Sequence, residues 1–413
     1  MELYDIFEQS AGVTTDSRKI EPGVIFFALH GANFDGNAFA IKALTDGAAY
    51  AVVDSAEVVE GSGEYRDRLI LVDDTLQSLQ QLAAEHRRRL AIPIIAIVGS
   101  NGKTTTKELI NAVLCENFAV YATRGNLNNH IGVPLTLLAM TRDTEFGIVE
   151  MGASAQKEIA LLCSIAQPNY GVLTNIGNAH LEGFGGKDGI RKGKGELFDY
   201  LEANGGRAFV PKEDNTLVEM ATERGDMATE LYSRAVAEGY KSQLSGDYNR
   251  YNIAAAVAVG SYFGVAAERI AAAIEGYTPE NNRSQELVTP HNNLLIIDCY
   301  NANPSSMEVA IANIASKNSE RKLLILGDML ELGEWSHEEH CRILELAIAV
   351  KDAELLLVGE NFRRAAHALG VGVTLCQDTT EAGEYLKPSN ISNTTILLKG
   401  SRGIALERLI GIL

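Results

Sequence analysis

The stretch from Ile94 to Lys107 reads IIAIVGSNGKTTTK and determines how the middle of the chain folds. Five apolar residues lead into a loop bounded by Gly99 and Gly102, and the amphipathic segment KELINAVL follows at once. This order predicts a strand, a glycine-rich turn and the first turn of a helix. Backbone N–H groups in such a turn, together with the positive end of the helix, form a cradle for phosphate.

The loop itself supplies the candidate nucleotide-binding residues. They are the consecutive residues Gly99, Ser100, Asn101, Gly102, Lys103, Thr104 and Thr105. Lys103 is expected to meet phosphate oxygens, and the hydroxyl of Thr104 to face Mg²⁺. The common P-loop starts with a glycine about five residues before the glycine of its Gly-Lys pair, where this chain has Ile97. The loop is therefore a shortened G-x-N-G-K-T form, which argues against an ordinary kinase or GTPase.

The composition is that of a globular protein with more than one domain. The chain has 413 residues, of which 46% are hydrophobic and 22% charged, and it is too long for a single core. Acidic residues outnumber basic ones by 54 to 36, which gives a formal charge of −18. We expect no nucleic-acid partner, because the chain has no excess of cations to displace condensed counterions.

The termini, apolar runs and cysteines indicate the compartment. The first residues, MELYDIFEQSAG, lack a basic segment followed by an apolar one, so we expect no secretory signal. The longest apolar runs fall short of the ~20 residues that cross a bilayer, so no membrane insertion is expected. The cysteines are odd in number and lack C-x-x-C spacing, which is typical of reduced thiols. We expect a cytoplasmic protein that acts as a monomer.

Apolar strands alternate with helical segments through most of the chain, which predicts an α/β fold with three domains. Residues 1–91 are expected to form a small mixed α/β domain, which ends just before Pro93. Residues 92–280 are expected to form a central, P-loop-type domain with a doubly wound, mostly parallel sheet. The polar segment YTPENNRSQ marks the second boundary, and residues 281–413 are expected to form a Rossmann-like α/β domain.

Polar residues follow several of the predicted strands. Glu150 closes FGIVEM, Asn175 follows YGVLT, and Asp298 closes LLIID. Parallel sheets place ligand-binding residues at the carboxyl ends of their strands, so all three are candidate site residues. A carboxylate beside a P-loop commonly holds Mg²⁺. The alternative for Glu150 is an ordinary solvated acid at the end of a strand.

Three further segments concentrate polar residues between strands. NIGNAHLEGFG places His180 in a loop flanked by glycines, and GIRKGKGELFDYL places Lys194 before an apolar helical run. RGNLNNHIGVPLTLL contains three close asparagines, Asn126, Asn128 and Asn129. Taken alone, a single histidine is more typical of a structural residue, and a basic run of a solvated patch. The asparagines could cap a helix, although three of them are more than capping requires.

Together these motifs resemble those of the Mur ligases over nearly the whole chain. The loop from Gly99 to Thr104 matches the family pattern G-T/S-N/S-G-K-T/S. The segment TTDSRKIEPGVIFFALHGANFDGNAFA is similar to the UDP-sugar-binding domain of the members that add the third residue or the terminal dipeptide. The dipeptide-adding member is indicated more narrowly by GNLNNHIGVPLTLL, VEMGA, NAHLEGFG, KGELF, DCYNANPSSM and LGDMLELGEWS.

The resemblance implies a ligase of peptidoglycan precursor synthesis whose substrates are UDP-N-acetylmuramoyl-tripeptide and D-alanyl-D-alanine. ATP would phosphorylate the terminal carboxylate of the tripeptide, and the amine of the dipeptide would attack the resulting acyl phosphate. Mg²⁺ would be the cofactor, because both charged steps need cations near the transferring oxygens. The first domain would bind the UDP precursor and the central one ATP, while the last would bind the amino substrate and close on ATP.

The resemblance also assigns roles to individual residues. The catalytic residues would be Lys103, Glu150, His180 and Lys194. The metal ligands would be Thr104, Glu150, His180 and Lys194 as a carbamylated lysine. Beyond the loop, ATP would be bound by Asn249, Asn252, Arg283 and Asp298. The UDP precursor would be bound by Ser17, Arg18, Asn126, Asn128 and Asn129. Phosphate or the dipeptide would be contacted by Lys399, Ser401 and Arg402 of the last domain.

Two residues depart from the family pattern, and three alternative functions remain. Tyr248 in GDYN and Asn37 after Asp35-Gly36 stand where histidine is usual. A sister ligase that adds meso-diaminopimelate as the third residue usually carries a D-N-P-R motif, which this sequence lacks. Folylpoly-γ-glutamate synthase lacks the TTDSR domain. A non-catalytic UDP-sugar-binding protein would not need the complete set of catalytic residues. The sequence does not specify the third residue of the acceptor peptide.

Overall fold

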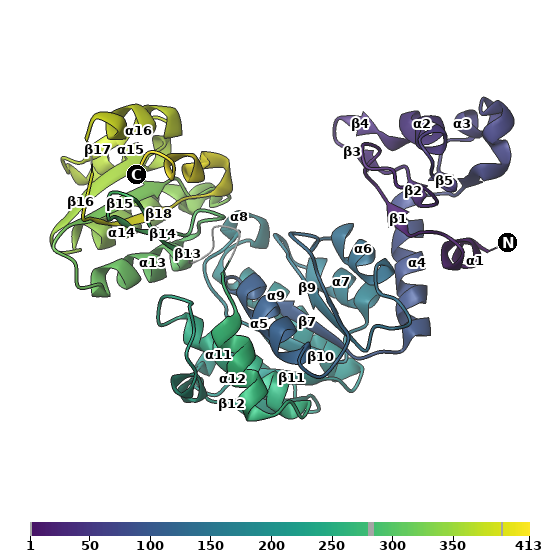
Figure 1. Ribbon diagram of the computed structural model, residues 1–413, viewed down its shortest axis with the longest axis horizontal. Coiled ribbons are helices and arrows are strands. Elements are labelled where there is room, and N and C mark those ends of the chain that lie inside the picture. Colours follow the sequence, from purple (N-terminus) through teal and green to yellow (C-terminus); the bar gives the residue numbers. More distant parts are fainter. Residues whose placement is uncertain (1, 280–284, 390) are drawn as a thin grey trace.

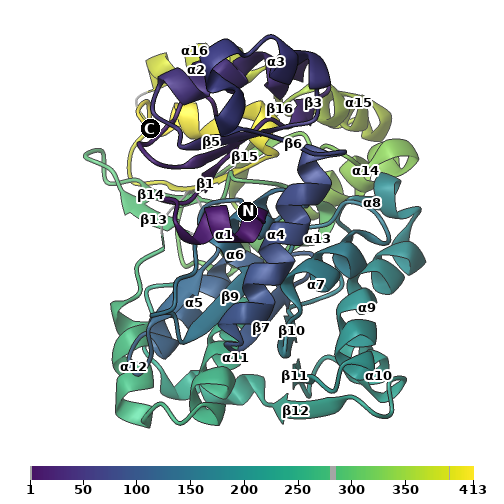
Figure 2. The ribbon, with the colours of Figure 1, turned by 90° about the vertical axis from the view of Figure 1, so that its right-hand side faces the viewer.

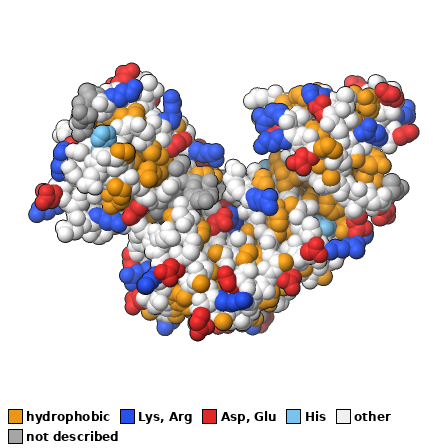
Figure 3. Space-filling view, in the orientation of Figure 1, with side chains coloured by type: hydrophobic (Ala, Val, Ile, Leu, Met, Phe, Trp, Pro, Cys, Tyr) orange, Lys and Arg blue, Asp and Glu red, His pale blue; other side chains and the backbone are white. Residues whose placement is uncertain are grey.

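The computed structural model describes residues 2–279, 285–389 and 391–413. It contains three α/β units, each built on its own sheet, which confirms the predicted fold class. The middle unit lies between the N-terminal and C-terminal units (Figure 1), and the surface is hollowed above it (Figure 3). The domain boundaries given above stay a prediction. No described helix is long and apolar enough to cross a bilayer.

The N-terminal unit has a four-stranded parallel sheet in the order β1-β2-β5-β6. Its strands are β1 (Val13–Thr14), β2 (Ile25–Phe27), β5 (Tyr50–Val53) and β6 (Leu69–Leu71). A separate antiparallel hairpin is formed by β3 (His30–Gly31) and β4 (Phe34–Asp35). The short helices are α1 (Leu3–Glu8), α2 (Ala40–Thr45) and α3 (Ala56–Glu60).

A long helix, α4 (Thr75–Leu90), connects the N-terminal unit to the middle unit (Figure 2). Asp74 caps its start by accepting a hydrogen bond from the Gln77 N–H at 2.8 Å. The helix contacts β2 and also packs against α6 (Gly132–Leu138) and α7 (Glu158–Ala166). Near its end, Arg87 donates to the carbonyl oxygen of Ala166 at 3.0 Å. The first two units therefore share one packed helix.

The middle unit has a six-stranded parallel sheet in the order β12-β11-β10-β7-β9-β8. Its strands are β7 (Ile94–Val98), β8 (Val120–Ala122), β9 (Phe146–Glu150), β10 (Tyr170–Leu173), β11 (Arg207–Pro211) and β12 (Ala228–Tyr232). Its other helices are α5 (Lys103–Leu114), α8 (Leu181–Phe184), α9 (Lys187–Ala203), α10 (Asn215–Thr222), α11 (Asn249–Tyr262) and α12 (Ala267–Gly276). The strand order reverses beside β7, where α/β proteins bind ligands.

Helix α9 differs from the sequence expectation. It begins at Lys187, so Lys194 lies in the middle of a helix and not at its start. Glycine is about 1 kcal/mol less favourable than alanine in a helix, so the glycines of this segment make its sequence look less helical than it is. Close packing against α8 requires the glycines: a Cβ on Gly189 would lie 1.8 Å from the Phe184 carbonyl oxygen, and one on Gly193 2.5 Å from the Phe184 ring.

The C-terminal unit has a six-stranded sheet in the order β13-β14-β18-β15-β16-β17, in which only β13 is antiparallel to its neighbour among the described strands. Its strands are β13 (Gln285–Val288), β14 (Leu294–Ile297), β15 (Lys322–Gly327), β16 (Ala353–Val358), β17 (Thr374–Cys376) and β18 (Thr395–Lys399). Its helices are α13 (Pro304–Ser316), α14 (Ser336–Ile348), α15 (Glu360–Leu369) and α16 (Thr379–Leu386). Helix α13 starts at the site described next.

Candidate active site

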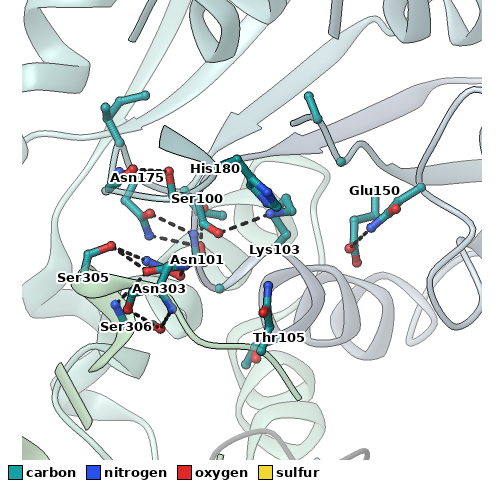
Figure 4. Close-up of a pocket in the computed structure, with 18 of the residues that line it drawn as sticks. Ser100, Asn101, Lys103, Thr105, Glu150, Asn175, His180, Asn303, Ser305 and Ser306 are labelled. Atoms are coloured by element: carbon teal, nitrogen blue, oxygen red, sulfur yellow. Dashed lines mark hydrogen bonds between the residues drawn. The ribbon is translucent and has the colours of Figure 1, made fainter. Parts of the chain in front are cut away.

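A cavity of about 1140 Å³ lies at the carboxyl ends of β7, β9 and β10 and extends to the C-terminal unit. Figure 4 shows side chains from both units around it. The predicted site residues that line it are Ser100, Asn101, Gly102, Lys103, Thr105, Asn126, Asn128, Asn129, Glu150, Asn175, His180, Asn252, Asp298 and Lys399. Residues far apart in the sequence therefore meet at one site.

The nucleotide loop requires glycine at its first position. Gly99 has φ +148°, and a Cβ there would lie 1.9 Å from the hydroxyl oxygen of Thr174. The same Thr174 hydroxyl donates to the Asn101 carbonyl oxygen at 2.6 Å, and the side-chain amide of Asn175 donates to it at 3.0 Å. The end of β10 thus holds the loop in place. In the sequence, its position after a strand had marked Asn175 as a candidate site residue, but nothing had marked Thr174.

Lys103 is the first residue of α5 and lies at the mouth of the loop. Its ammonium donates to the carbonyl oxygens of Gly99 at 2.6 Å and Ser100 at 3.3 Å. These contacts keep a cation beside backbone N–H groups at the positive end of a helix, where anions bind favourably.

Glu150 is buried, so the alternative of a solvated acid is wrong. One carboxylate oxygen accepts a hydrogen bond from the Thr104 hydroxyl at 2.8 Å, and the other accepts from the Asn128 amide at 2.8 Å. The Thr104 hydroxyl and the Glu150 carboxylate are hard oxygen ligands of the kind that Mg²⁺ prefers. Among the described residues there is no cluster of three His, Cys, Asp or Glu side chains that could hold a metal. A Thr–Glu pair still fits Mg²⁺, which usually completes its shell with substrate phosphates and water.

The ring Nδ1 of His180 contacts the carboxylate of Glu331, which reaches it from the C-terminal unit. Both residues have the left-handed backbone conformation, with φ +54° for His180 and +62° for Glu331. Burial lowers the pKa of His180, although the nearby carboxylate of Glu331 opposes this shift, and the cations of Lys194 and Lys103 lower the pKa further. Nothing in the sequence LGDMLELGE predicts the backbone conformation that brings Glu331 to this site.

Lys194 is 1% exposed, so a solvated basic patch is also wrong. Its ammonium donates to the carbonyl oxygen of Ala153 at 3.0 Å and lies 4.8 Å from the centre of the Phe184 ring. Burial lowers its pKa well below the usual value, and the charge of Lys103 adds to the shift. Lys194 is not among the residues lining the large cavity, but Ala153 is.

Asn249 and Asn252, both predicted to bind ATP, form one hydrogen-bonded pair. The side-chain oxygen of Asn252 accepts from the Thr106 hydroxyl at 3.0 Å, and its amide donates to the side-chain oxygen of Asn249 at 2.8 Å. Asn252 lines the cavity, whereas Asn249 lies behind it. Tyr248, which stands where histidine is usual, also lines the cavity, as does Tyr251, which the sequence analysis missed.

The buried Lys399 forms an ion pair at 2.8 Å with Asp298, whose side chain is partly exposed. The Lys399 ammonium also donates to the carbonyl oxygens of Asp298 at 3.3 Å and Asn301 at 3.0 Å. An ammonium has three N–H donors, so these acceptors account for all of them. Ser401 is likewise engaged, since its hydroxyl oxygen accepts from the Leu330 N–H at 3.0 Å.

The start of α13 joins the nucleotide loop to the C-terminal unit. The Asn101 amide donates to the Ser305 hydroxyl at 2.9 Å, and the Asn303 amide donates to the Asn101 side-chain oxygen at 2.8 Å. Asn303 also caps α13 by accepting from the Ser306 N–H at 2.9 Å. No sequence expectation placed Asn303, Ser305 or Ser306 at the site, although the Asn-Pro-x-Ser pattern signals a helix start.

The remaining predicted residues lie elsewhere. Ser17 and Arg18 line a separate cavity of about 490 Å³ in the N-terminal unit. Arg402 lines a third cavity, of about 130 Å³, between the middle and C-terminal units. Thr104 does not line the large cavity, but its hydroxyl donates to Glu150, which does. Arg283 lies outside the described residues. Asn37, the second departure from the family pattern, is buried and donates to Asp54 at 2.7 Å.

Comparison with known proteins covers most of the chain. Residues 97–235 match the Mur ligase middle domain, residues 282–402 the Mur ligase, glutamate ligase domain, and residues 9–87 the Mur ligase family, catalytic domain. The UDP-N-acetylmuramoyl-tripeptide–D-alanyl-D-alanine ligase of Bacillus subtilis is 34% identical, over 98% of this chain and 93% of its own. The Escherichia coli ligase of the same name is 32% identical, over 96% and 92%. A crystal structure of MurF from Acinetobacter baumannii superposes with a TM-score of 0.86 at 29% identity, covering 98% of this chain and 97% of that one.

Proposed function

The chain belongs to the Mur ligase family, and on that premise we propose that it uses ATP to join D-alanyl-D-alanine to UDP-N-acetylmuramoyl-tripeptide. The substrate pair is that of the ligases from B. subtilis and E. coli that match it over nearly their full length. We also propose that it works as a monomer in the cytoplasm.

One structural observation carries the proposal. The nucleotide loop and the segment around Asp298 belong to different units, yet both line the same cavity with Glu150 and His180. A ligase that activates a carboxylate with ATP must bring nucleotide, acceptor and amine to one point, which a simple binding protein need not do.

The first step would transfer the γ-phosphoryl group of ATP to the terminal carboxylate of the tripeptide. The Lys103 ammonium and the loop N–H groups would bind the β- and γ-phosphates, while Asn252 and Asp298 would bind adenine and ribose. Negative charge moves onto the transferred oxygens during this step, and a cation that is already in place lowers the barrier most. The bonds that hold Lys103 to Gly99 and Ser100 provide such preorganisation.

Thr104, Glu150 and His180 would hold Mg²⁺, which would neutralise phosphate charge when bound. Lys194 would join this group after its amine had reacted with CO₂ to give a carbamate. That reaction needs a neutral amine, and burial favours the neutral form of Lys194. Because Lys194 lies behind Ala153, the modified side chain would approach the site from within the protein.

The second step would be attack of the dipeptide amine on the acyl phosphate, which yields an amide bond and releases phosphate. Water competes with the amine at this stage, so the site must be closed. The Asn101–Ser305 hydrogen bond between the two units supports closure of the C-terminal unit over the nucleotide loop.

The test is a reconstituted reaction with ATP, Mg²⁺ and the UDP-linked tripeptide, with products identified by mass spectrometry. D-Ala-D-Ala should be joined to the tripeptide, and single amino acids should not. Turnover of a diamino acid onto the dipeptide precursor, with D-Ala-D-Ala ignored, would replace this function by that of the sister ligase. No phosphate release with both substrates present would support a binding protein instead.

A further inference from the structure

One wall of the site is formed by residues 328–331, a short segment that follows strand β15 in the C-terminal unit. Its last residue, Glu331, lines both the large cavity and the cavity of about 130 Å³, and its carboxylate contacts the ring of His180. The four residues belong neither to β15 nor to α14. Contacts other than those of a helix or sheet must therefore keep Glu331 in place.

His340 on α14 holds the backbone of this segment from the interior of the unit. Its ring is fully buried, and its Nε2 accepts a hydrogen bond from the Met329 N–H at 3.0 Å. Its Nδ1 lies 2.6 Å from the carbonyl oxygen of Ser336. A carbonyl oxygen can only accept, so Nδ1 carries the proton and Nε2 is left to accept. A neutral ring in this one tautomer satisfies both bonds.

The surroundings of His340 favour this neutral form. The Phe362 ring packs edge to face against it, with 4.7 Å between the ring centres. Burial lowers the pKa of His340, although the Ser336 carbonyl and the Asp328 carboxylate oppose this shift. The Asp328 carboxylate is occupied elsewhere, since it accepts from the N–H groups of Asn361 and Phe362 at 2.9 Å each. The Nε2 of His340 is therefore available to Met329.

Ser401 holds the residues on either side of Met329. Its N–H donates to the Asp328 carbonyl oxygen at 3.1 Å, and its hydroxyl oxygen accepts from the Leu330 N–H at 3.0 Å. Backbone groups of three successive residues before Glu331 are thus fixed by two side chains. Ser401 belongs to the KGSRG segment, which the sequence already assigned to the site, whereas no motif singled out His340.

We propose that His340 is a positioning residue of the ligase reaction, whose ring fixes Met329 and thereby keeps Glu331 against His180. The inference rests on the proposed ligase function and adds to it a residue that lines neither cavity. Met329 is buried, so its N–H would be left without a partner if the acceptor were lost, and the segment would have to move. Charged groups act on a reaction through their exact placement, so the chemical step should slow while the substrates still bind.

Three substitutions separate the acceptor from the bulk of the ring. His340→Gln places an amide oxygen near the position of Nε2, so it can still accept from Met329. His340→Asn is too short to reach Met329, and His340→Leu fills the space against Phe362 without an acceptor. The Asn and Leu variants should lower kcat by about tenfold or more, and the Gln variant by less than about threefold. The KM values for ATP and for the UDP precursor should change by less than about twofold in all three.

Asn293→Ala is the matched control for a general loss of stability in the same unit. Asn293 is fully buried and accepts from the Thr394 N–H at 3.1 Å. It precedes the amino end of β14, whereas residues 328–331 follow the carboxyl end of β15, at the opposite edge of the sheet. This variant should lower Tm and leave kcat at the wild-type value.

Hydrogen–deuterium exchange tests the placement without substrates. A peptide covering residues 328–332 should exchange faster by about tenfold or more in the Asn and Leu variants, because the Met329 N–H has lost its acceptor. The same peptide should stay protected in the Gln variant. This readout needs no turnover, so it remains valid if the proposed ligase function fails, in which case the wild-type enzyme would form no product from D-Ala-D-Ala.

Any of three outcomes would overturn the assignment. A kcat for His340→Leu within about twofold of the wild type would show that Glu331 is placed without His340. Equal losses of kcat in the Gln and Leu variants would show that the ring acts by its packing and not as an acceptor. Unchanged exchange of residues 328–332 in the Asn and Leu variants would show that the Met329 bond does not hold the segment.

Discussion

Asn101 in the nucleotide loop donates its side-chain amide to the hydroxyl of Ser305, a residue 204 positions later, at 2.9 Å. Asn303 completes the contact by donating to the Asn101 side-chain oxygen at 2.8 Å. The loop that would hold ATP and the helix α13 of the C-terminal unit are thus joined by three short polar side chains. Such contacts can exchange with water at little cost, because each hydrogen bond contributes only about 1 kcal/mol net.

Replacing Asn303 should affect stability and nucleotide use together. Asn303→Ala removes the cap of α13 and should lower the free energy of unfolding by about 1 kcal/mol. It also removes the bond to Asn101, so the KM for ATP should rise. Asp378→Ala is the matched control, because Asp378 caps α16 of the same unit by accepting from the Thr380 N–H at 2.8 Å. Equal KM values in the two variants, at equal loss of stability, would contradict a coupling through Asn303.

Lys103→Ala should lower kcat by a factor of about one hundred or more, because it removes a preorganised cation from the transferring phosphate. Binding of the UDP precursor, measured by calorimetry, should be retained, since Ser17 and Arg18 lie in a separate cavity. Lys241→Ala, which removes an exposed lysine outside the cavity, should leave both properties unchanged. Loss of precursor binding together with activity would argue against separate nucleotide and precursor sites.

Lys194 offers a chemical test, since its carbamate would be an oxygen anion. Lys194→Ala should lose most of the ligase activity, and added acetate should restore part of it by placing a carboxylate in the vacated space. Because Lys194 is buried against Phe184, Lys194→Met keeps the packing and serves as a second variant without the amine. Lys192→Ala removes an exposed lysine of the same helix and should leave the ligase activity unchanged. Near-normal turnover of both Lys194 variants without bicarbonate would exclude the carbamate.

The ion pair between the buried Lys399 and Asp298 predicts a positioning role for the lysine. Lys399→Met should raise the KM for ATP by about tenfold, because the Asp298 carboxylate loses the charged partner that holds it in place. Asp298→Asn should do the same, and the double variant should be little worse than either single one. Additive losses in this double-mutant cycle would show instead that Lys399 contacts the substrate directly.

His86 predicts how stability depends on pH. Its Nε2 lies 2.9 Å from the Met140 carbonyl oxygen and its Nδ1 3.0 Å from the Tyr4 hydroxyl, an arrangement that the neutral ring satisfies. Burial lowers the pKa of His86 below its usual 6.5, so the unfolded chain binds the proton more readily. The stabilising contribution is therefore complete above about pH 6.5 and is lost as the pH falls below it.

The corresponding measurement is the change in Tm between about pH 7.5 and about pH 5.5. His86→Gln should make this change smaller than in the wild type. His367→Gln, which replaces an exposed histidine on α15, should leave it as it was. An unchanged pH dependence of Tm in His86→Gln would show that the pKa of His86 is the same in the folded and unfolded chain, which contradicts this prediction.

Local patterns made the strands and the nucleotide loop predictable, because alternating apolar runs and glycine spacing depend on neighbours in sequence. Glu150 could be placed at a strand end, but its bond to Thr104 depends on the neighbouring strand β7. Asp328, which also closes a strand, proved to cap α15 by accepting from the Phe362 N–H at 2.9 Å. Glu331 could not be predicted, since its role depends on a backbone conformation and on how two units pack.

Helix α4 limits the positions at which related chains can be recombined. Pro93 looks like a boundary in the sequence, yet Arg87 and the apolar face of α4 are packed into the middle unit. A recombination event at Pro93 would join a foreign helix face to α6 and α7 and leave mismatched side chains between them. The first two units should therefore be exchanged between relatives only as a pair, whereas the C-terminal unit, held to the nucleotide loop by Asn303 and Ser305, is the part that evolution could replace alone.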